Sequence, residues 1–530
     1  MKAVSSKKLA GILCILLPVF FLISMFAGCS AAKDTLVILS GSENDTLEPI
    51  LEKFGRENNV NVEMVYKGSV DIMLDLEKGD TEADVIWPAN SLWITLGDAN
   101  HIIKHSKSIM TSPVVFGIRK SLARELGFID KKVSVGDILD AINSGKLRFM
   151  MTSASQSNSG ASAYIGFLYA LLGNPETITM ENLHDPRLND NIRNLLAGIN
   201  RSSGSSGWLK DLFLKGDYDA MVNYESVIIE TNQELTKEGK EPLYAVYPYD
   251  GLVIADSPLC YVNRGDEKKE ELYMKLQEYL LSEKVQAEIA GLGRRTGLGG
   301  VTSGYSQSVF NPDWGIDPQK ILSPVRMPAA AVIKEALNLY QTQFKKPSYT
   351  FFCLDFSGSM GGNGEKMLKE AMRTLLDQES AKQYLLQSSK EDVTVVMPFS
   401  GQVLGSWKVE GNDPADLAEL IREIDGFSPG GSTDIYSPVL QAVDRIRSID
   451  TDKYIVSVVL MTDGESNTGS NLADLKAGWE ALGKDIPVFS ILFGSASEKQ
   501  LTAIADLTRA RIFDGKADLI DAFKKVRGYN

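Results

Sequence analysis

Five oxygen-bearing side chains in the C-terminal third of the chain have the types and spacing of a divalent-cation site. Asp355, Ser357 and Ser359 lie together directly after the apolar run YTFFCL. Thr433 follows in the segment GGSTD, and Asp463 follows the apolar run VSVVLMT. Mg²⁺ prefers hard oxygen ligands such as carboxylates and hydroxyls, about six of them at roughly 2.0–2.1 Å. The pattern therefore predicts a Mg²⁺ site, with Mn²⁺ or Ca²⁺ as the alternative ions.

The runs that flank these residues predict the elements that must position them. Apolar runs alternate with helical stretches such as 434–449, which predicts a parallel α/β sheet. In such a sheet the strand-to-helix turns line up along the carboxyl edge, where ligands usually bind. The alternative is purely structural, because Ser357 or Thr433 could cap a helix and the segment TDG could form a turn.

Other chemistry fits these residues poorly. The chain has three histidines, His101, His105 and His184, and none later in the sequence, which excludes a Ser-His-Asp triad or an HExxH site within the C-terminal half. The glycine-rich segment GSMGGNGEK lacks the spacing of a phosphate loop. We therefore predict that the protein is not an enzyme. A metal-dependent hydrolase is the remaining alternative, with Glu465 as its candidate base.

The order DxSxS, then Thr, then Asp resembles the von Willebrand factor A domain and its metal-ion-dependent adhesion site. The resemblance implies a Rossmann-like fold for residues 346–530. It implies that the three hydroxyls touch the metal and that the two aspartates act directly or through water. It also implies that an open coordination position accepts a Glu or Asp side chain from a protein partner, as in adhesion at a cell surface.

The N-terminus has the pattern of an export signal. Residues 1–8 carry three lysines, and residues 9–26 form an uncharged apolar run, which together predict a signal peptide over residues 1–28. The sequence Ala27-Gly28-Cys29 resembles the lipobox of bacterial lipoproteins, in which the cysteine is lipidated and becomes the new N-terminus. An uncleaved transmembrane helix is the alternative. Either interpretation predicts a protein held at the extracytoplasmic face of a membrane.

Residues 29–345 form a second predicted domain, which ends in the proline-marked stretch 323–348. The segments TLVILS, VNVEMVY and ADVIWP read as buried strands, and 47–58 and 69–80 read as helices. The order of these and later segments resembles the extracellular solute-binding proteins of ABC importers. The resemblance implies an α/β, two-lobed clamshell of the periplasmic-binding-protein type 2 class, in which the chain leaves lobe one near 113 and returns near 255.

Such proteins bind a small ligand between their lobes, using loops at strand ends and helix N-termini. Exposed amides and hydroxyls at a helix N-terminus suit an anion. Helix capping and turn formation are the alternative roles for these clusters. The candidate ligand residues are Ser40, Gly41, Ser42, Ser69, Ser157, Asn158, Ser159, Tyr224 and Glu225.

Composition restricts the partners further. The chain of 530 residues carries 55 Lys+Arg against 69 Asp+Glu, a net charge of −14, which argues against nucleic-acid binding. Cys260 and Cys353 stand in apolar runs and are predicted to be buried free thiols. We expect a lipid-anchored binding protein with a protein partner at the metal and a small solute in the clamshell. The alternative is the solute-binding component of an importer, which would work with a membrane permease.

Overall fold

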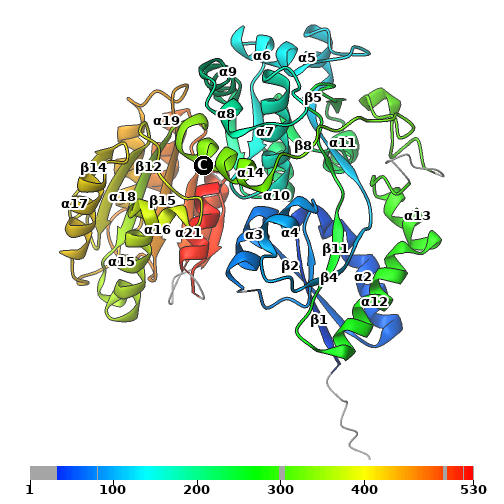
Figure 1. The fold of residues 1–530 in the computed structure, drawn as a ribbon. Helices are drawn as coiled ribbons and strands as arrows, with labels where there is room; N and C mark the ends of the chain where they lie inside the picture. Colours follow the sequence, from blue (N-terminus) through cyan, green and yellow to red (C-terminus); the bar gives the residue numbers. More distant parts are fainter. Residues whose placement is uncertain (1–32, 80, 298–304, 493–497, 517–518, 529–530) are drawn as a thin grey trace, which may run out of the picture.

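The computed structural model describes residues 33–79, 81–297, 305–492, 498–516 and 519–528, and they form three sheets. The predicted signal peptide and Cys29 lie outside the described residues. Figure 1 shows two lobes, each built on a sheet, and a third α/β unit beside them. No helix within the described ranges is long and apolar enough to cross a membrane.

Lobe one is a five-stranded sheet in the order β2-β1-β3-β11-β4. Its strands β1 and β2 are parallel, and β11 runs antiparallel to both of its neighbours. Strands are β1 (Thr35–Ser40), β2 (Asn61–Tyr66), β3 (Val85–Trp87), β4 (Ile103–Ser108) and β11 (Pro258–Val262); helices are η1 (Ser42–Leu47), α2 (Glu48–Asn58), α3 (Ser69–Lys78), α4 (Leu92–Gly97), α12 (Glu267–Leu281) and α13 (Glu283–Gly291).

Lobe two is a six-stranded sheet in which β10-β5-β8-β6-β7 follow one another and β9 pairs with β5. Strands are β5 (Ser112–Arg119), β6 (Phe149–Thr152), β7 (Ile199–Ser203), β8 (Ala220–Tyr224), β9 (Leu243–Val246) and β10 (Ile254–Ala255). Helices are α5 (Lys120–Glu125), α6 (Val135–Asn143), α7 (Asn158–Leu171), α8 (Met180–Leu183), α9 (Pro186–Ala197), α10 (Ser206–Lys215), α11 (Glu225–Lys237), η3 (Pro312–Trp314) and α14 (Ala330–Leu339).

The chain crosses between the lobes three times, from β4 to β5, from β10 back to β11, and again between α13 and η3. The two-lobed fold predicted from the sequence is therefore confirmed, and the first two crossings fall close to residues 113 and 255. One prediction was wrong, because the segment VNVEMVY forms the strand β2 but this strand is not buried. It is the edge strand of its sheet, and its side chains alternate between exposed and half-buried. An edge strand lacks a neighbour on one side, so apolar content alone could not place it inside.

The third unit is a doubly wound sheet in the order β14-β13-β12-β15-β16-β17, parallel except for the edge strand β14. Strands are β12 (Ser348–Asp355), β13 (Val393–Phe399), β14 (Trp407–Glu410), β15 (Ile455–Thr462), β16 (Val488–Leu492) and β17 (Ile512–Asp514). Helices are η5 (Gly358–Met360), α15 (Asn363–Leu376), α16 (Gln378–Lys382), α17 (Pro414–Asp425), α18 (Tyr436–Ile446), α19 (Leu472–Leu482), α20 (Glu498–Leu507) and α21 (Leu519–Gly528). The turn η4 (Tyr340–Phe344) continues α14 and packs in the core of lobe two.

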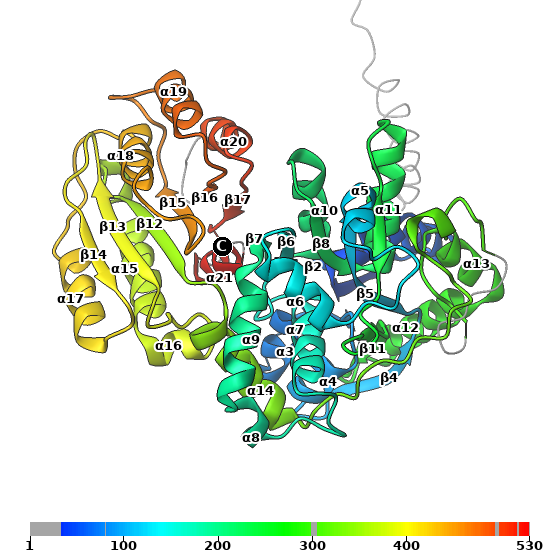
Figure 2. The same cartoon turned by 90° about the horizontal axis from the view of Figure 1, so that it is seen from above.

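Separate apolar cores cover the two faces of this third sheet. Helices α15, α17 and α21 pack on one face, and α18, α19 and α20 pack on the other. Figure 2 shows these layers from above, with β17 and α21 nearest to lobe two. Helices on both faces of a mostly parallel sheet define the Rossmann-like class that the sequence predicted.

Helix α14 joins the two parts but belongs to the core of lobe two. Its residues Val332, Ile333 and Leu337 are buried among the side chains of that lobe. The hydroxyl of Tyr164 donates to the carbonyl of Ala336 at 2.9 Å. The new sheet starts at Ser348, only nine residues after α14 ends at Leu339, so the connection between the two domains is short.

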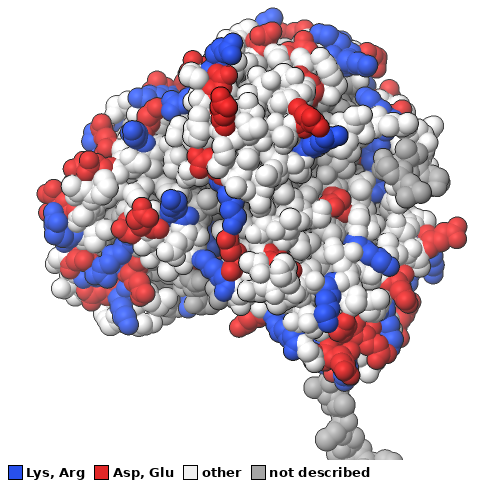
Figure 3. All heavy atoms as spheres, in the orientation of Figure 1, with Lys and Arg blue, Asp and Glu red and all other residues white. Residues whose placement is uncertain are grey.

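The face seen in Figure 3 carries charges of both signs, and Cys260 and Cys353 are buried. On the face seen in Figure 3, basic and acidic side chains are interspersed rather than gathered into one basic patch. Cys260 and Cys353 are free and buried, as predicted, and burial raises the pKa of each thiol to about 12.

Candidate functional site

The central strand of the third sheet positions the first part of the predicted metal site. Strand β12 lies between β13 and β15, and it ends at Asp355. Strand β15 pairs with β12 in parallel, with Leu354 opposite Met461, so the ends of the two strands meet at one edge. The hydroxyl of Thr462 donates to Oδ2 of Asp355 at 2.6 Å. Asp463 follows directly, at the first position after β15.

The two serines connect the two aspartates. The amide of Ser357 donates to Oδ1 of Asp355 at 2.7 Å, and the hydroxyls of Ser357 and Ser359 lie 3.1 Å apart. The hydroxyl of Ser359 donates to Oδ1 of Asp463 at 2.8 Å. Four of the five predicted residues therefore form one continuous chain of polar contacts along the carboxyl edge.

Thr433 reaches the same point from a separate loop. A Cβ placed on Gly464 would lie 3.0 Å from Oγ of Ser359 and 3.3 Å from Oγ1 of Thr433, so the two hydroxyls flank one position. This loop is fastened to the serine loop by backbone hydrogen bonds, from Gly358 to the carbonyl of Gly431 at 3.1 Å and from Gly430 to the carbonyl of Phe356 at 2.9 Å. All five residues thus meet at the edge of one sheet.

The two carboxylates in this cluster are held in an unfavourable environment. Asp355 is fully buried and Asp463 nearly so. Burial raises the pKa of Asp355, and the nearby charge of Asp463 raises it further, while hydrogen bonds from Thr462 and Ser357 act in the opposite direction. Burial also raises the pKa of Asp463. A cation among these oxygens would relieve the unfavourable charge.

Three supporting residues were missed by the sequence interpretation. Thr462 bonds Asp355, Gly464 leaves room for the hydroxyls, and Asn467 accepts from the amide of Thr433 at 3.1 Å. Thr462 and Gly464 flank Asp463 in the segment TDG, so that segment carried the signal. Asn467 could not be found, because its contact depends on the path of the loop after β15.

The deep part of the cleft between the lobes is almost filled. Only about 20 Å³ remains there, in a space that Tyr224 and Arg294 help to line, which is room for one water molecule. Arg294 forms an ion pair with Glu230 at 2.7 Å, and Arg295 forms two hydrogen bonds of 2.7 Å with Glu225. Glu225 is therefore engaged in an internal ion pair rather than directed into open space.

A larger cavity of about 430 Å³ lies at the outer end of this cleft. Of the predicted ligand residues, Ser42, Ser69, Ser157 and Asn158 line it. The remaining five do not. Their polar groups make internal contacts instead. Ser40 accepts from Asn44, the amide of Gly41 donates to the carbonyl of Trp87, Ser159 bonds Thr152 and Ser206, the hydroxyl of Tyr224 accepts from the side-chain amide of Asn158, and Glu225 pairs with Arg295.

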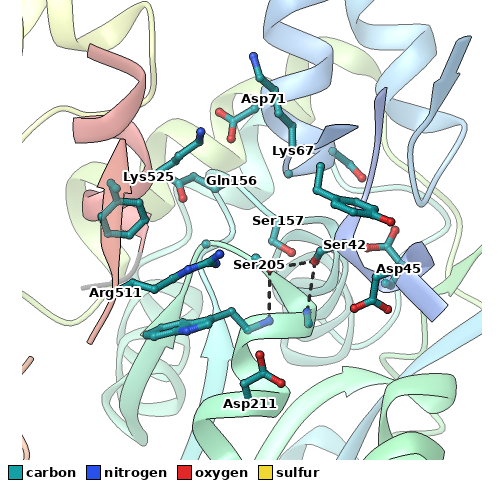
Figure 4. Close-up of a pocket in the computed structure, with 18 of the residues that line it drawn as sticks. Ser42, Asp45, Lys67, Asp71, Gln156, Ser157, Ser205, Asp211, Arg511 and Lys525 are labelled. Carbon is teal, nitrogen blue, oxygen red and sulfur yellow. Dashed lines mark hydrogen bonds between the residues drawn. The ribbon is translucent and has the colours of Figure 1, made fainter. Parts of the chain in front are cut away.

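Helix N-termini from both lobes open onto this cavity. Helix α3 of lobe one begins at Ser69, and α7 and α10 of lobe two begin at Asn158 and Ser206. Figure 4 shows hydroxyls and carboxylates from the lobes directed into the space, with Ser42 hydrogen-bonded to Ser205 at 2.9 Å. Polar groups of this kind can bind a small hydrophilic solute.

The opposite wall of the cavity comes from the third unit, which the sequence could not reveal. Arg511, Phe513, Asp514 and Lys525 all line the space, and they belong to β17 or α21 or lie next to them. In Figure 4, Arg511 and Lys525 face the lobes from the side opposite Asp45. Nothing in a linear pattern indicates that a strand near residue 512 meets loops near residues 42 and 157.

Comparison with known families agrees with this architecture. Residues 36–295 match the family model of the bacterial extracellular solute-binding proteins, and residues 351–524 match that of the von Willebrand factor type A domain. The protein thus contains a solute-binding domain followed by an A-type domain. Both are families of binding proteins.

Individual relatives are distant. Inter-alpha-trypsin inhibitor heavy chain H3 from Pongo abelii and from Homo sapiens is 25% identical over 158 residues, which is 28% of this chain and 17% of either relative. The chain therefore spans about a sixth of the length of those relatives.

Solved structures that are similar to this chain align with a little more than half of it. The periplasmic binding protein AfuA from Actinobacillus pleuropneumoniae is 15% identical with a TM-score of 0.45, over 59% of this chain and 99% of that one. The sulfate-binding protein SubI from Mycobacterium tuberculosis is 16% identical with a TM-score of 0.39, over 57% and 96%. The ferric binding protein from Campylobacter jejuni is 16% identical with a TM-score of 0.43, over 57% and 98%.

Proposed function

We propose that this protein is an extracytoplasmic binding protein whose A-type domain binds a protein partner through a divalent metal. The observation that carries the proposal is the cluster at the carboxyl edge, where two buried aspartates and three hydroxyls converge. These are oxygen donors only, and they carry two negative charges, which suits Mg²⁺ better than a softer ion. The residues that would hold the ion are Asp355, Ser357, Ser359, Thr433 and Asp463.

The metal would supply a positive charge with an open coordination position for an acidic side chain of the partner. The chain's own residues prepare this site. Thr462 and the amide of Ser357 hold the carboxylate of Asp355 in place, and Ser359 holds that of Asp463. Ser359 is exposed, so a partner can approach the cluster from solvent at that residue.

The solute-binding domain would bind a small polar solute in the cavity at the outer end of the cleft. Hydroxyls and helix N-termini of both lobes support this assignment. A lipid on Cys29 would keep both domains at the membrane surface. No catalytic step is proposed, because the serines of the cluster bond one another and the aspartates.

Calorimetric titration of Mg²⁺ into the purified protein tests the metal site. We expect one binding event for the wild type and none for Asp355→Ala. The matched control is Asp425→Ala, which removes an aspartate from an exposed ion pair with Arg373 in the same domain. Equal Mg²⁺ affinity in Asp355→Ala and the wild type would show that the site is wrongly assigned.

The second candidate function is the solute-binding component of an importer, with the A-type domain as an accessory. The polar cavity favours it. A thermal-shift screen of the protein against anions, sugars and amino acids tests solute binding, and we expect at least one of these classes to raise the melting temperature. A screen without any stabilising compound would count against both the importer role and the solute site.

A further inference from the structure

The A-type domain contacts the solute-binding domain through the edge of its sheet that lies opposite the metal cluster. Residues that precede the strands make these contacts: Asp485 comes before β16, Arg509 comes before β17, and Gln387 comes before β13. The cluster residues instead follow their strands. Because β12, β13, β15, β16 and β17 are parallel, the two groups of residues stand at opposite ends of the sheet.

One group of contacts fastens the A-type domain to lobe two. Asp485 lies 3.0 Å from the guanidinium of Arg201, and it accepts a hydrogen bond of 2.5 Å from the hydroxyl of Tyr218. Arg201 also donates to the carbonyl of Arg509 at 3.1 Å. Arg201 is almost completely buried, so it depends on these contacts to compensate its charge.

A second group reaches lobe one through helix α21. The ammonium of Lys524 lies 3.7 Å from the carboxylate of Asp71, at the start of α3, and both side chains are largely buried. The carbonyl of the same Lys524 accepts a hydrogen bond from the side chain of Gln156, which belongs to lobe two. Lys78 of lobe one lies over the ring of Tyr384 in the A-type domain, 3.6 Å from its centroid. A single residue of α21 therefore touches both lobes.

The two lobes are closed on one another at the same place. The amide of Val70 in lobe one donates to the carbonyl of Gln156 in lobe two at 3.1 Å. The amide of Gly207 in lobe two donates to the hydroxyl of Ser42 in lobe one at 3.2 Å. These bonds must break if the lobes separate, and the residues that make them lie beside the cavity that the A-type domain also lines.

We propose that the A-type domain is a clamp on the solute-binding domain: it bridges both lobes, forms the third wall of the solute cavity and holds the lobes closed. The identity of the cavity as a solute site rests on the proposed function, whereas the clamping of the lobes does not.

The wall also changes the chemistry of the cavity. The lobes contribute several carboxylates, among them Asp45 and Asp211, together with Lys67, and the A-type domain contributes the cationic side chains of Arg511 and Lys525 beside Asp514 (Figure 4). Arg511 lies over the ring of Trp208, 5.9 Å from its centroid. With the clamp in place, a negative group of a solute can lie near Arg511 and Lys525, while hydrogen-bond donors of the same solute can face the carboxylates of the lobes.

Hydrogen–deuterium exchange on the full chain, without solute or metal, tests the clamp. The variant Asp485→Ala/Lys524→Ala removes one ion pair to each lobe, that of Asp485 with Arg201 and that of Lys524 with Asp71. We expect the amides of Val70 and Gly207 to exchange at least about tenfold faster in this variant, because their bonds break when the lobes open. The matched control is Asp425→Ala/Lys408→Ala, which removes the same charges from exposed pairs within the A-type domain. It should leave both amides unchanged.

Protection in the central strands β1, β5 and β12 shows whether the variant is folded. Unchanged exchange at Val70 and Gly207 in a folded variant overturns the clamp, whether or not the segments around Asp485 and Arg509 lose protection. If the double variant does not fold, the single variant Arg201→Gln replaces it. Faster exchange is again expected at the amides of Val70 and Gly207. Failure to bind any solute would reject the proposed solute site and leave this measurement unaffected.

Discussion

Two groups of buried charged side chains in this protein have opposite surroundings. In the cleft, Glu225 and Arg295 form a two-bond ion pair, and Arg294 pairs with Glu230, so each of these four residues has an opposite charge beside it. At the edge of the A-type sheet, Asp355 and Asp463 stand near one another with hydroxyls as neighbours, and the pKa of each is raised. The first arrangement stabilises the fold. The second leaves negative charge for a ligand to compensate, which is the usual mark of a functional site.

The largest expected effect is on the paired charges. Replacing Glu225 with alanine leaves Arg295 buried without its partner, so we expect the free energy of unfolding to fall by about 3–5 kcal/mol. Chemical denaturation monitored by circular dichroism measures this loss. The conservative change Glu225→Gln keeps one acceptor oxygen at this position, so the free energy of unfolding should fall by less than in the alanine variant. A loss below about 1 kcal/mol for the alanine variant would mean that the pair does not stabilise the lobe.

The two aspartates at the edge of the A-type sheet should respond to metal instead. Saturating the wild type with Mg²⁺ at a hundred times its dissociation constant should stabilise it by about 2.7 kcal/mol. The variant Asp355→Asn should show no such gain, since it loses a charged ligand. Thermal unfolding with Mg²⁺ and with a chelator measures both. Full Mg²⁺ stabilisation of the variant would remove the contrast between the two sites.

A supporting residue should have a smaller effect. In Thr462→Val the shape of the side chain is kept, but the hydrogen bond to Asp355 is lost. We expect Mg²⁺ affinity to fall about 10- to 100-fold, as is typical when a partner of a metal ligand is removed. Calorimetry checks this. An unchanged affinity would show that the 2.6 Å bond to Asp355 does not orient the ligand.

The smallest effect concerns pH in the absence of metal. Because the folded protein raises the pKa of Asp355, it binds this proton more tightly than the unfolded chain does. The charged form therefore destabilises the fold above the folded pKa, and this cost disappears as pH falls below the unfolded value. In chelator, Asp355→Asn should be more stable than the wild type at neutral pH, and the difference should shrink as pH falls. A constant difference would contradict the assigned pKa direction.

There is a physical reason why the sequence could predict that the five oxygen-bearing residues meet at one edge. Strands β12 and β15 are buried, parallel and adjacent, so apolar runs alone show where they end, and the residues at those ends must meet. Thr433 could be included because the family pattern names it. The cleft was harder to predict. Ser159, Tyr224 and Glu225 are residues of the expected types, but their polar atoms bond other residues of the protein.

What the sequence determined by itself is therefore the local chemistry: two α/β domains, the ends of their strands and the oxygen-bearing side chains at one edge of the second. Periodicity and strand termination are properties of neighbouring residues, so they can be read along the chain. Only the tertiary structure decided that β17 and α21 form a wall of the cavity at the outer end of the cleft and that Lys524 reaches both lobes. Those contacts join residues hundreds of positions apart through the packing of whole domains, and no local pattern encodes that packing.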